Sequence, residues 1–172
     1  MTQIDRRAVL SGLALAGGTL TAGSARAAPT ILPMSELKKE AEVACLYHCD
    51  FGDVPRYTQL LNNIGNHYSA YGSDPFALQL AIVAHSGGVK FFLEKLDETP
   101  WKDDAAAVAP LFEKVQNLAK NGLKIYLCDI TFERLKLDRA NAKVAPFIAF
   151  VPSGVATVAA LQSKGFGYLK VG

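Results

Sequence analysis

The chain has 172 residues, half of them apolar and one fifth charged, and it contains 14 Gly, 8 Pro and 3 Cys. This composition excludes a disordered chain, a collagen-like repeat and a disulfide-dense miniprotein, and the length suits one globular domain with a hydrophobic core. The formal net charge is only +2, and no basic run with interleaved aromatic residues is present. Charge-driven binding of nucleic acid is therefore not expected.

The first 27 residues have the features of an export signal. Arg6 and Arg7 precede an apolar stretch rich in Gly and Ala, which ends in the small-residue cleavage pattern Ala25-Arg26-Ala27. The arginine pair indicates the twin-arginine route, and the apolar run is shorter than the roughly 20 residues that a membrane-spanning helix needs. We therefore predict cleavage before Ala28 and a periplasmic product without a membrane anchor. Its acidic and basic side chains are equal in number.

The remainder, residues 28–172, is predicted to be a single domain, because it shows no linker and no internal repeat. Residues 28–40 are expected to be loosely ordered. The apolar runs that we predict to be strands cover residues 43–49, 76–84, 123–128, 147–151 and 166–171. Nearly unbroken apolar runs are typical of strands that are buried on both faces of a parallel sheet.

Helices are predicted between these strands. Asp53 can cap a helix with Pro55 in its first turn, and apolar residues then recur at helical spacing from Tyr57 to Tyr71. A further helix is expected to begin near Val89.

The second half of the chain continues the alternation. Residues 97–104 resemble a surface loop, and Pro110 is expected in the first turn of the next helix, which ends before Gly122. Ser153 can cap a last helix that ends before Gly165. Strands separated by helices of this length predict an α/β protein, a three-layer α/β/α sandwich with a mostly parallel five-stranded sheet.

Two cysteines are candidates for chemistry, because ligands bind at the carboxyl edge of an open parallel sheet. Cys49 and Cys128 each end a predicted strand, and a helix N-terminus beside such a thiol favours its thiolate. Cys128 fits this description best, and it is our candidate catalytic residue. Either cysteine can also be an inert core residue, and a disulfide between them would require neighbouring strands. Cys45 lies four residues before Cys49 and is expected on the same face of the strand. It is predicted to fill the core.

Polar and small residues follow two other strands at the same edge. His85 precedes a glycine pair whose amides can hold an anion, although a plain turn would have the same sequence. The candidate ligand-binding residues are Cys49, His85, Gly87, Gly88, Ser153 and Gly154. His48 is interpreted as a buried structural histidine. No CxxC, HxxxH, GxSxG or phosphate-loop motif is present, so neither a metal site nor a cofactor is predicted.

An ordered set of segments resembles one known family. The segments are His48-Cys49-Asp50-Phe51-Gly52-Asp53, Leu60-Leu61-Asn62-Asn63-Ile64, Ile82-Val83-Ala84-His85-Ser86-Gly87-Gly88-Val89-Lys90, Gly122-Leu123-Lys124-Ile125-Tyr126-Leu127-Cys128, and Val151-Pro152-Ser153-Gly154-Val155 with Leu161-Gln162 and Gly165-Phe166-Gly167-Tyr168. In this order they are similar to the exported branch of the DsrE/DsrF-like family. The resemblance implies a three-layer α/β/α fold and association into homotrimers or homohexamers. Phe91 and Phe92 are expected to contribute contact surface.

The resemblance also implies a function in sulfur metabolism. In the sulfur-relay members, a cysteine at the position of Cys128 carries sulfane sulfur as a persulfide and hands it to a partner protein. Here Asp129 and Glu133 follow, where those members have small and basic residues, and two carboxylates disfavour a nearby thiolate. Arg134 can replace the basic residue. The alternative is a non-catalytic oligomeric module that binds a small ligand or a metal in the same crevice, with Cys128 structural.

Overall fold

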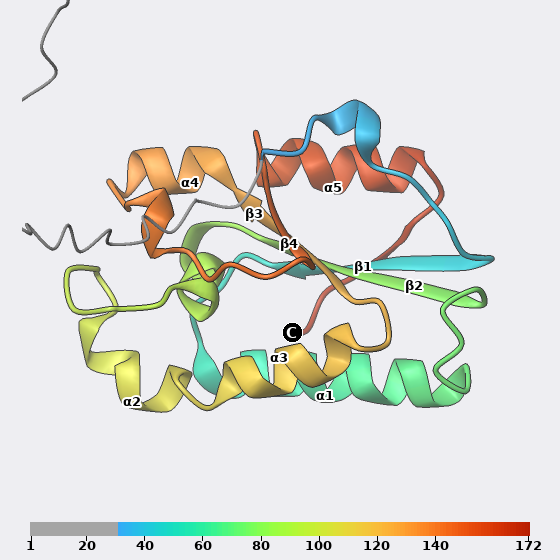
Figure 1. Ribbon diagram of the computed structural model, residues 1–172, viewed down its shortest axis with the longest axis horizontal. Coiled ribbons are helices and arrows are strands. Elements are labelled where there is room, and N and C mark those ends of the chain that lie inside the picture. The colour runs from blue at the N-terminus through green and yellow to red at the C-terminus, as the bar shows by residue number, and fades with distance from the viewer. Residues whose placement is uncertain (1–30) are drawn as a thin grey trace, which may run out of the picture.

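A computed structural model of the protein describes residues 31–172, so the predicted export signal lies outside the described residues. Within them, five strands form one sheet in the order β4-β3-β2-β1-β5, and every strand pair is parallel (Figure 1). The strands are β1 (Val43–Cys49), β2 (Leu78–Ala84), β3 (Lys124–Cys128), β4 (Ile148–Val151) and β5 (Gly167–Leu169).

Helices cover both faces of the sheet, which confirms the predicted α/β fold. Helices α1 (Val54–Ala70) and α3 (Leu111–Ala119) lie on one face, and α5 (Gly154–Ser163) lies on the other (Figure 1). Each interface has its own cluster of buried apolar side chains. The larger cluster lies under α1 and α3 and contains most of the aromatic residues.

Short helices complete the connections. They are α2 (Ala105–Val108) and α4 (Asp129–Arg134), together with the 3-10 helices η1 (Met34–Glu36), η2 (Ser86–Phe92), η3 (Lys102–Asp104) and η4 (Arg139–Asn141). Helix η2 follows β2 and helix α4 follows β3, so both begin at the carboxyl edge of the sheet. Together they frame the region in which the chemistry is expected.

Predicted capping residues act at several helix ends. The Asp53 carboxylate accepts a hydrogen bond from the Arg56 backbone N–H at 2.8 Å, and the Ser153 hydroxyl accepts one from Ala156 N–H at 3.3 Å. Gly122 ends the turn after α3 with a φ of +91°, a conformation that glycine adopts without strain. The sequence therefore determines where these helices begin and end.

Two local predictions need correction. Strand β2 begins at Leu78, because the Asp74 carboxylate accepts the Phe76 N–H and holds a turn, which leaves Phe76 82% exposed. The segment near Val89 is a 3-10 helix, and all residues from Gly88 to Phe92 are buried. Because five consecutive residues are buried, this part of the helix has no solvent face and its sequence shows no amphipathic periodicity.

The burial of η2 also removes an expected contact surface. Phe91 and Phe92 are 1% and 0% exposed, and the Phe91 ring stacks on Tyr57 with centroids 3.7 Å apart. They belong to the core and offer nothing to a second copy of the chain. Within the described part of residues 28–40, Leu37 is fully buried and Ile31 pairs with Phe150, so this segment packs onto the domain.

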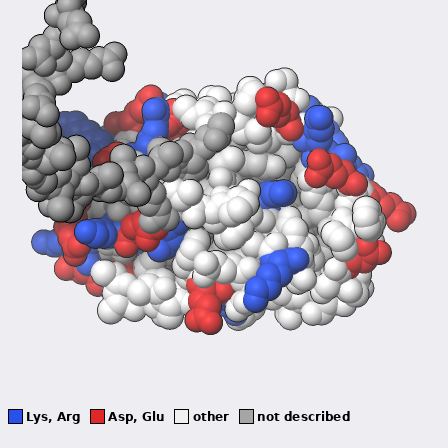
Figure 2. All heavy atoms as spheres, viewed as in Figure 1, with Lys and Arg blue, Asp and Glu red and all other residues white. Residues whose placement is uncertain are grey.

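The surface carries both signs of charge. In Figure 2 acidic and basic side chains are interspersed around one face of the molecule, and the centre of that face is largely uncharged. This distribution agrees with the balanced composition. No helix in residues 31–172 has the length and apolar character that a membrane span requires.

Candidate functional site at the carboxyl edge of the sheet

Side chains from neighbouring strands meet on the α5 side of the carboxyl edge. Alternation along β1 and β3 directs His48 and Cys128 to this side, whereas Cys49 faces the cluster under α1 and α3. Leu127 pairs with Ala84, so Cys128 and His85, one residue further along, lie next to each other. Both approach Gly154 at the start of α5, where an added Cβ would lie 2.9 Å from the His85 Cβ and 3.1 Å from the Cys128 Cβ.

A cavity of about 590 Å³ opens at this edge. It is lined by His85, Ser86, Gly87, Pro100, Trp101, Cys128, Ile130, Thr131, Arg134, Leu135, Ser153 and Val155. Its walls are mostly apolar, and Arg134 is the one charged side chain among the lining residues of the described chain. The size and character suit a small molecule.

Cys128 lines this cavity although only 5% of the residue is exposed. It ends β3 and is the N-cap residue of α4, so strand and helix both fix its backbone. The thiol is free. It therefore lies at the wall of the cavity, at the end of the strand where the sequence predicted it.

The carboxylate next to Cys128 is neutralised within the protein. Arg139 donates two hydrogen bonds to the two oxygens of Asp129, at 2.5 and 2.6 Å, and also reaches Glu133 at 3.4 Å. A paired carboxylate exerts a much weaker field on a neighbouring thiolate than a free one. Arg139 thus pairs with the nearer of the two acidic residues that follow Cys128 and reaches the other more loosely.

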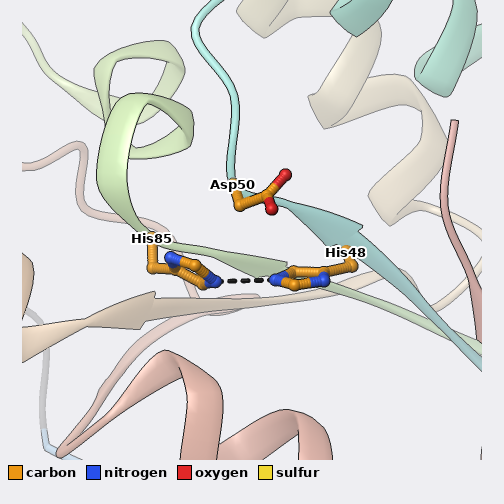
Figure 3. Close-up of side chains that lie close together, drawn as sticks. All are labelled: His48, Asp50 and His85. Atoms are coloured by element: carbon orange, nitrogen blue, oxygen red, sulfur yellow. Dashed lines mark hydrogen bonds between the residues drawn. The ribbon is translucent and has the colours of Figure 1, made fainter. Parts of the chain in front are cut away.

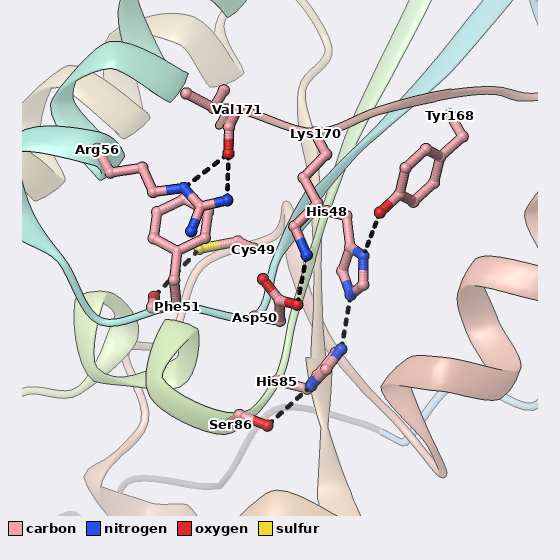
Figure 4. Close-up of polar contacts among 10 residues, drawn as sticks. All are labelled: His48, Cys49, Asp50, Phe51, Arg56, His85, Ser86, Tyr168, Lys170 and Val171. Carbon is pink, nitrogen blue, oxygen red and sulfur yellow. Dashed lines mark hydrogen bonds and ion pairs between the residues drawn. The ribbon is translucent and has the colours of Figure 1, made fainter.

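A chain of hydrogen bonds runs from β5 to the cavity. The Tyr168 hydroxyl lies 2.7 Å from His48 Nδ1, His48 Nε2 lies 2.6 Å from His85 Nε2, and His85 Nδ1 lies 3.0 Å from the Ser86 hydroxyl (Figure 4). One imidazole must donate its Nε2–H to the other. The hydroxyl beside the donating ring then donates to that ring's Nδ1, and the hydroxyl beside the accepting ring accepts that ring's Nδ1–H. The donors and acceptors along this series of hydrogen bonds can therefore be ordered in either direction.

Both imidazoles are held in the neutral form. Burial lowers the pKa of His48, and the charges of His85 and Lys170 lower it further, while Asp50 opposes them. Burial also lowers the pKa of His85, while the charge of Asp50 raises it and that of Lys170 lowers it. At neutral pH each ring therefore keeps one nitrogen lone pair.

Asp50 lies beside the histidine pair. Burial raises the pKa of its carboxyl group, but the hydrogen bond from Lys170 Nζ at 2.7 Å and the charge of His48 outweigh burial and lower the pKa below its ordinary value. The C-terminal segment that carries Lys170 is fixed by Arg56, which donates to the Val171 carbonyl at 2.6 Å (Figure 4). Asp50 is thus an ionised carboxylate at neutral pH.

Cys49 does not reach the cavity. It is fully buried in the core cluster under α1, its Sγ lies 3.9 Å from the Phe51 carbonyl oxygen, and burial raises the pKa of its thiol well above the ordinary value. Strand β2 separates its strand from that of Cys128, so the two thiols cannot form a disulfide. Its place in the core disagrees with the ligand-binding role expected for it. Cys45 is half-buried and packs against the same cluster.

The glycines at the edge differ in their roles. Gly87 lines the cavity, but a Cβ on Gly88 would overlap the carbonyl oxygen of Cys49, and the Gly88 N–H already donates to the His85 carbonyl at 2.9 Å. The Gly88 amide is therefore not free to hold an anion. Gly154 is buried between Cys128 and His85, where it allows close approach and does not line the cavity.

Sequence analysis missed His48, Asp50 and Tyr168 as parts of the site. His48 points to the face of β1 opposite to Cys49, and it was interpreted as a structural histidine. The same alternation directs His48 to the side of Cys128. Tyr168 on β5 pairs with Leu46 of β1, a neighbour that no short motif reveals. The spacing His48-x-Asp50 was the available signal, since two residues of a strand end separated by one can both reach an edge site.

The fold and the edge site define the class of protein: an α/β/α sandwich with an all-parallel sheet and a cysteine at the carboxyl edge. The model of the DsrE/DsrF-like family matches residues 56–171, which is most of the chain, and the protein belongs to that family. A solved structure of a protein of unknown function, MTH1491 from Methanobacterium thermoautotrophicum, is similar with a TM-score of 0.58 and 19% identity, covering 75% of this chain and 99% of that one. At this identity the likeness shows the fold. A search of curated proteins gave no significant match.

Proposed function

We propose that the protein carries sulfane sulfur as a persulfide on Cys128 and passes it to a partner protein. The observation that carries the proposal is the position of the thiol, because Cys128 is the cysteine that lines the cavity at the carboxyl edge. The DsrE/DsrF-like family, to which the chain belongs, is associated with sulfur relay. The donor and acceptor are a low-molecular-weight persulfide or polysulfide and a protein thiol.

The transfer is a balanced thiol exchange. The Cys128 thiolate attacks the terminal sulfur of a donor persulfide, forms a new S–S bond, and releases the donor as a thiolate after its own S–S bond breaks. One S–S bond forms and one breaks, so no external oxidant or reductant is needed. Delivery is the same exchange, in which an acceptor thiolate attacks the outer sulfur and Cys128 leaves as the thiolate.

The surroundings of Cys128 support an anionic persulfide. Arg134 supplies a positive charge at the cavity wall, and Arg139 neutralises the neighbouring Asp129. Ser153 and Val155 bring the first turn of α5 to the cavity, and the amide groups of a first turn have no acceptors within the helix. The apolar walls limit water, which protects a persulfide from competing reactions.

Intact-mass spectrometry of the reduced protein, before and after exposure to polysulfide, tests the proposal. We expect a gain of about 32 Da for each added sulfur atom in the wild type and no gain in Cys128→Ser. Cys45→Ser is the matched control, since Cys45 is a half-buried thiol outside the cavity and its loss should leave the gain unchanged. Circular dichroism verifies that each variant is folded.

A folded wild type that gains no sulfur at Cys128 would overturn the proposal. The second candidate function, a binding module with a structural Cys128, would then remain, and saturable binding of a small ligand that survives Cys128→Ser would support it. The apolar walls of the cavity, with Trp101 and Pro100, favour this candidate.

Export and assembly belong to the same proposal. We propose that the protein works in the periplasm after cleavage before Ala28, and that it forms a homotrimer or homohexamer. N-terminal sequencing of the protein from a periplasmic fraction and light scattering of the purified protein test the two statements. An intact N-terminus in the cytoplasm or a monomer at micromolar concentration would contradict them.

A further inference from the structure

Two imidazole rings at the carboxyl edge turn the same nitrogen atom toward each other. His48 on β1 and His85 after β2 place their Nε2 atoms 2.6 Å apart, and the Asp50 carboxylate lies beside the pair (Figure 3). One potential ligand atom from each of the three residues lies within 4.8 Å of the other two. All three side chains are half-buried, so the cluster is not a loose group of surface charges.

The far nitrogens of both rings already have partners. His48 Nδ1 is 2.7 Å from the Tyr168 hydroxyl, and His85 Nδ1 is 3.0 Å from the Ser86 hydroxyl (Figure 4). Histidine ligands of metals almost always donate the N–H of the second nitrogen in this way, which fixes the ring and its tautomer. When an ion replaces the Nε2–Nε2 hydrogen bond, both rings can carry their proton on Nδ1, where the two hydroxyl oxygens accept it, and both Nε2 lone pairs then face the ion.

We propose that His48, His85 and Asp50 bind a divalent transition-metal ion of the zinc class. Two imidazole nitrogens and one carboxylate oxygen suit Zn²⁺ and other late first-row ions, whereas Mg²⁺ and Ca²⁺ prefer oxygen ligands alone. Three protein ligands leave a fourth position of a tetrahedral ion for water or for an incoming ligand. The ligand set contains no thiol, although His85 also lines the cavity that holds Cys128.

Metal binding requires only small movements of side chains. At metal–nitrogen distances of about 2.1 Å, two ligands of a tetrahedral ion lie roughly 3.4 Å apart, so the ion replaces the Nε2–Nε2 hydrogen bond and widens the gap. Asp50 binds Lys170 through Oδ2, which leaves Oδ1 for the ion. Lys170 can thus remain as the partner that orients the carboxylate.

Zinc binding to the full chain, freed of metal with a chelator, tests the proposal. We expect one Zn²⁺ per chain by equilibrium dialysis, a zinc-dependent rise in Tm, and no binding of Mg²⁺. His48→Ala and His85→Ala should each weaken zinc binding at least about a hundredfold, and Tyr168→Phe, which removes only an outer partner, about tenfold. Cobalt gives a second readout, because tetrahedral Co²⁺ absorbs visible light and a thiolate ligand would add a strong charge-transfer band.

Two variants serve as controls. His67 on α1 lies outside the cluster, with Nδ1 3.2 Å from the Tyr47 hydroxyl, so His67→Ala should bind zinc like the wild type. Cys128→Ser should also bind normally, and this result separates the metal site from the sulfur carrier. The proposal is wrong if the folded wild type binds no zinc, if a His48→Ala/His85→Ala double variant binds it unchanged, or if Cys128→Ser abolishes binding.

Discussion

Cys49 and Cys128 both end parallel strands, yet they lie in opposite environments. Cys49 faces the layer of α1 and α3, where it is fully buried among aromatic and aliphatic side chains. Cys128 faces the other layer and lines a cavity at the edge of α5. Burial raises the pKa of the Cys49 thiol and prevents its contact with any reagent.

The difference comes from alternation and from what covers each side. A one-residue difference in register turns a side chain to the other face of a sheet, so two cysteines at equivalent strand ends need not share a function. On the Cys49 side, η2 folds back over the strand ends and fills the space with Phe91 and Phe92. On the Cys128 side, the connections leave an opening. Position at a strand end is thus not sufficient to bring a thiol to the cavity.

The reactivity of the two thiols gives the largest expected effect. In the native protein, iodoacetamide should alkylate Cys128 at least about a hundredfold faster than Cys49, because a fully buried thiol reacts only after the structure opens. Peptide mapping by mass spectrometry after timed exposure measures both rates. In denaturant the two rates should become equal. Comparable native rates would contradict the contrast between the two sides.

Alanine substitutions at Gly88 and Gly154 compare the packing around Cys49 with the packing around Cys128. Gly88→Ala should lower the free energy of unfolding by at least about 3 kcal/mol, because the new Cβ would overlap the backbone carbonyl of Cys49, which cannot move alone. Gly154→Ala should cost less, about 1–3 kcal/mol, since its Cβ would meet the His85 and Cys128 side chains at 2.9 and 3.1 Å beside an open cavity. Urea unfolding measures both.

Gly65 within α1 is the matched control for these two variants. An added Cβ there would lie 3.8 Å from the Leu118 Cδ2, an ordinary contact, so Gly65→Ala should stabilise the protein by about 0.5–1 kcal/mol through helix propensity. If Gly88→Ala proved as harmless as Gly65→Ala, η2 would not be packed against β1 as described.

Acid should lower the free energy of unfolding through His48 and His85, on the Cys128 side of the sheet, by a smaller amount than these glycine substitutions. The pKa values of His48 and His85 are lowered in the folded protein, so the unfolded chain binds more protons and the free energy of unfolding falls as pH falls below 6.5 through the lowered values. Urea unfolding at several pH values, with a chelator present, measures this slope. His48→Asn should flatten it. His67 also has a lowered pKa, so His67→Asn measures the part that arises outside the site.

Most of the fold was predictable from local chemistry. The bounds of β1 agree with the predicted residues 43–49, and the caps of Asp53 and Ser153 act as expected, because these features depend on the nearest few residues. The predictions failed where packing overrides periodicity. Residues 86–92 form a 3-10 helix that is buried from Gly88 to Phe92, and β5 is shorter than the predicted 166–171, because only three residues pair with β1.

The candidate site also has a part that was predictable from the sequence and a part that was not. Sequence alone identified Cys128, His85 and Ser153 at the carboxyl edge, because alternating strands and helices require all strand ends to meet there. It preferred Cys128 but placed Cys49 in the same crevice, and it did not bring His48 to His85, because these contacts depend on strand order and on which layer covers each face. Those are long-range properties of the sheet, and they determine which thiol meets the cavity and which nitrogens face each other.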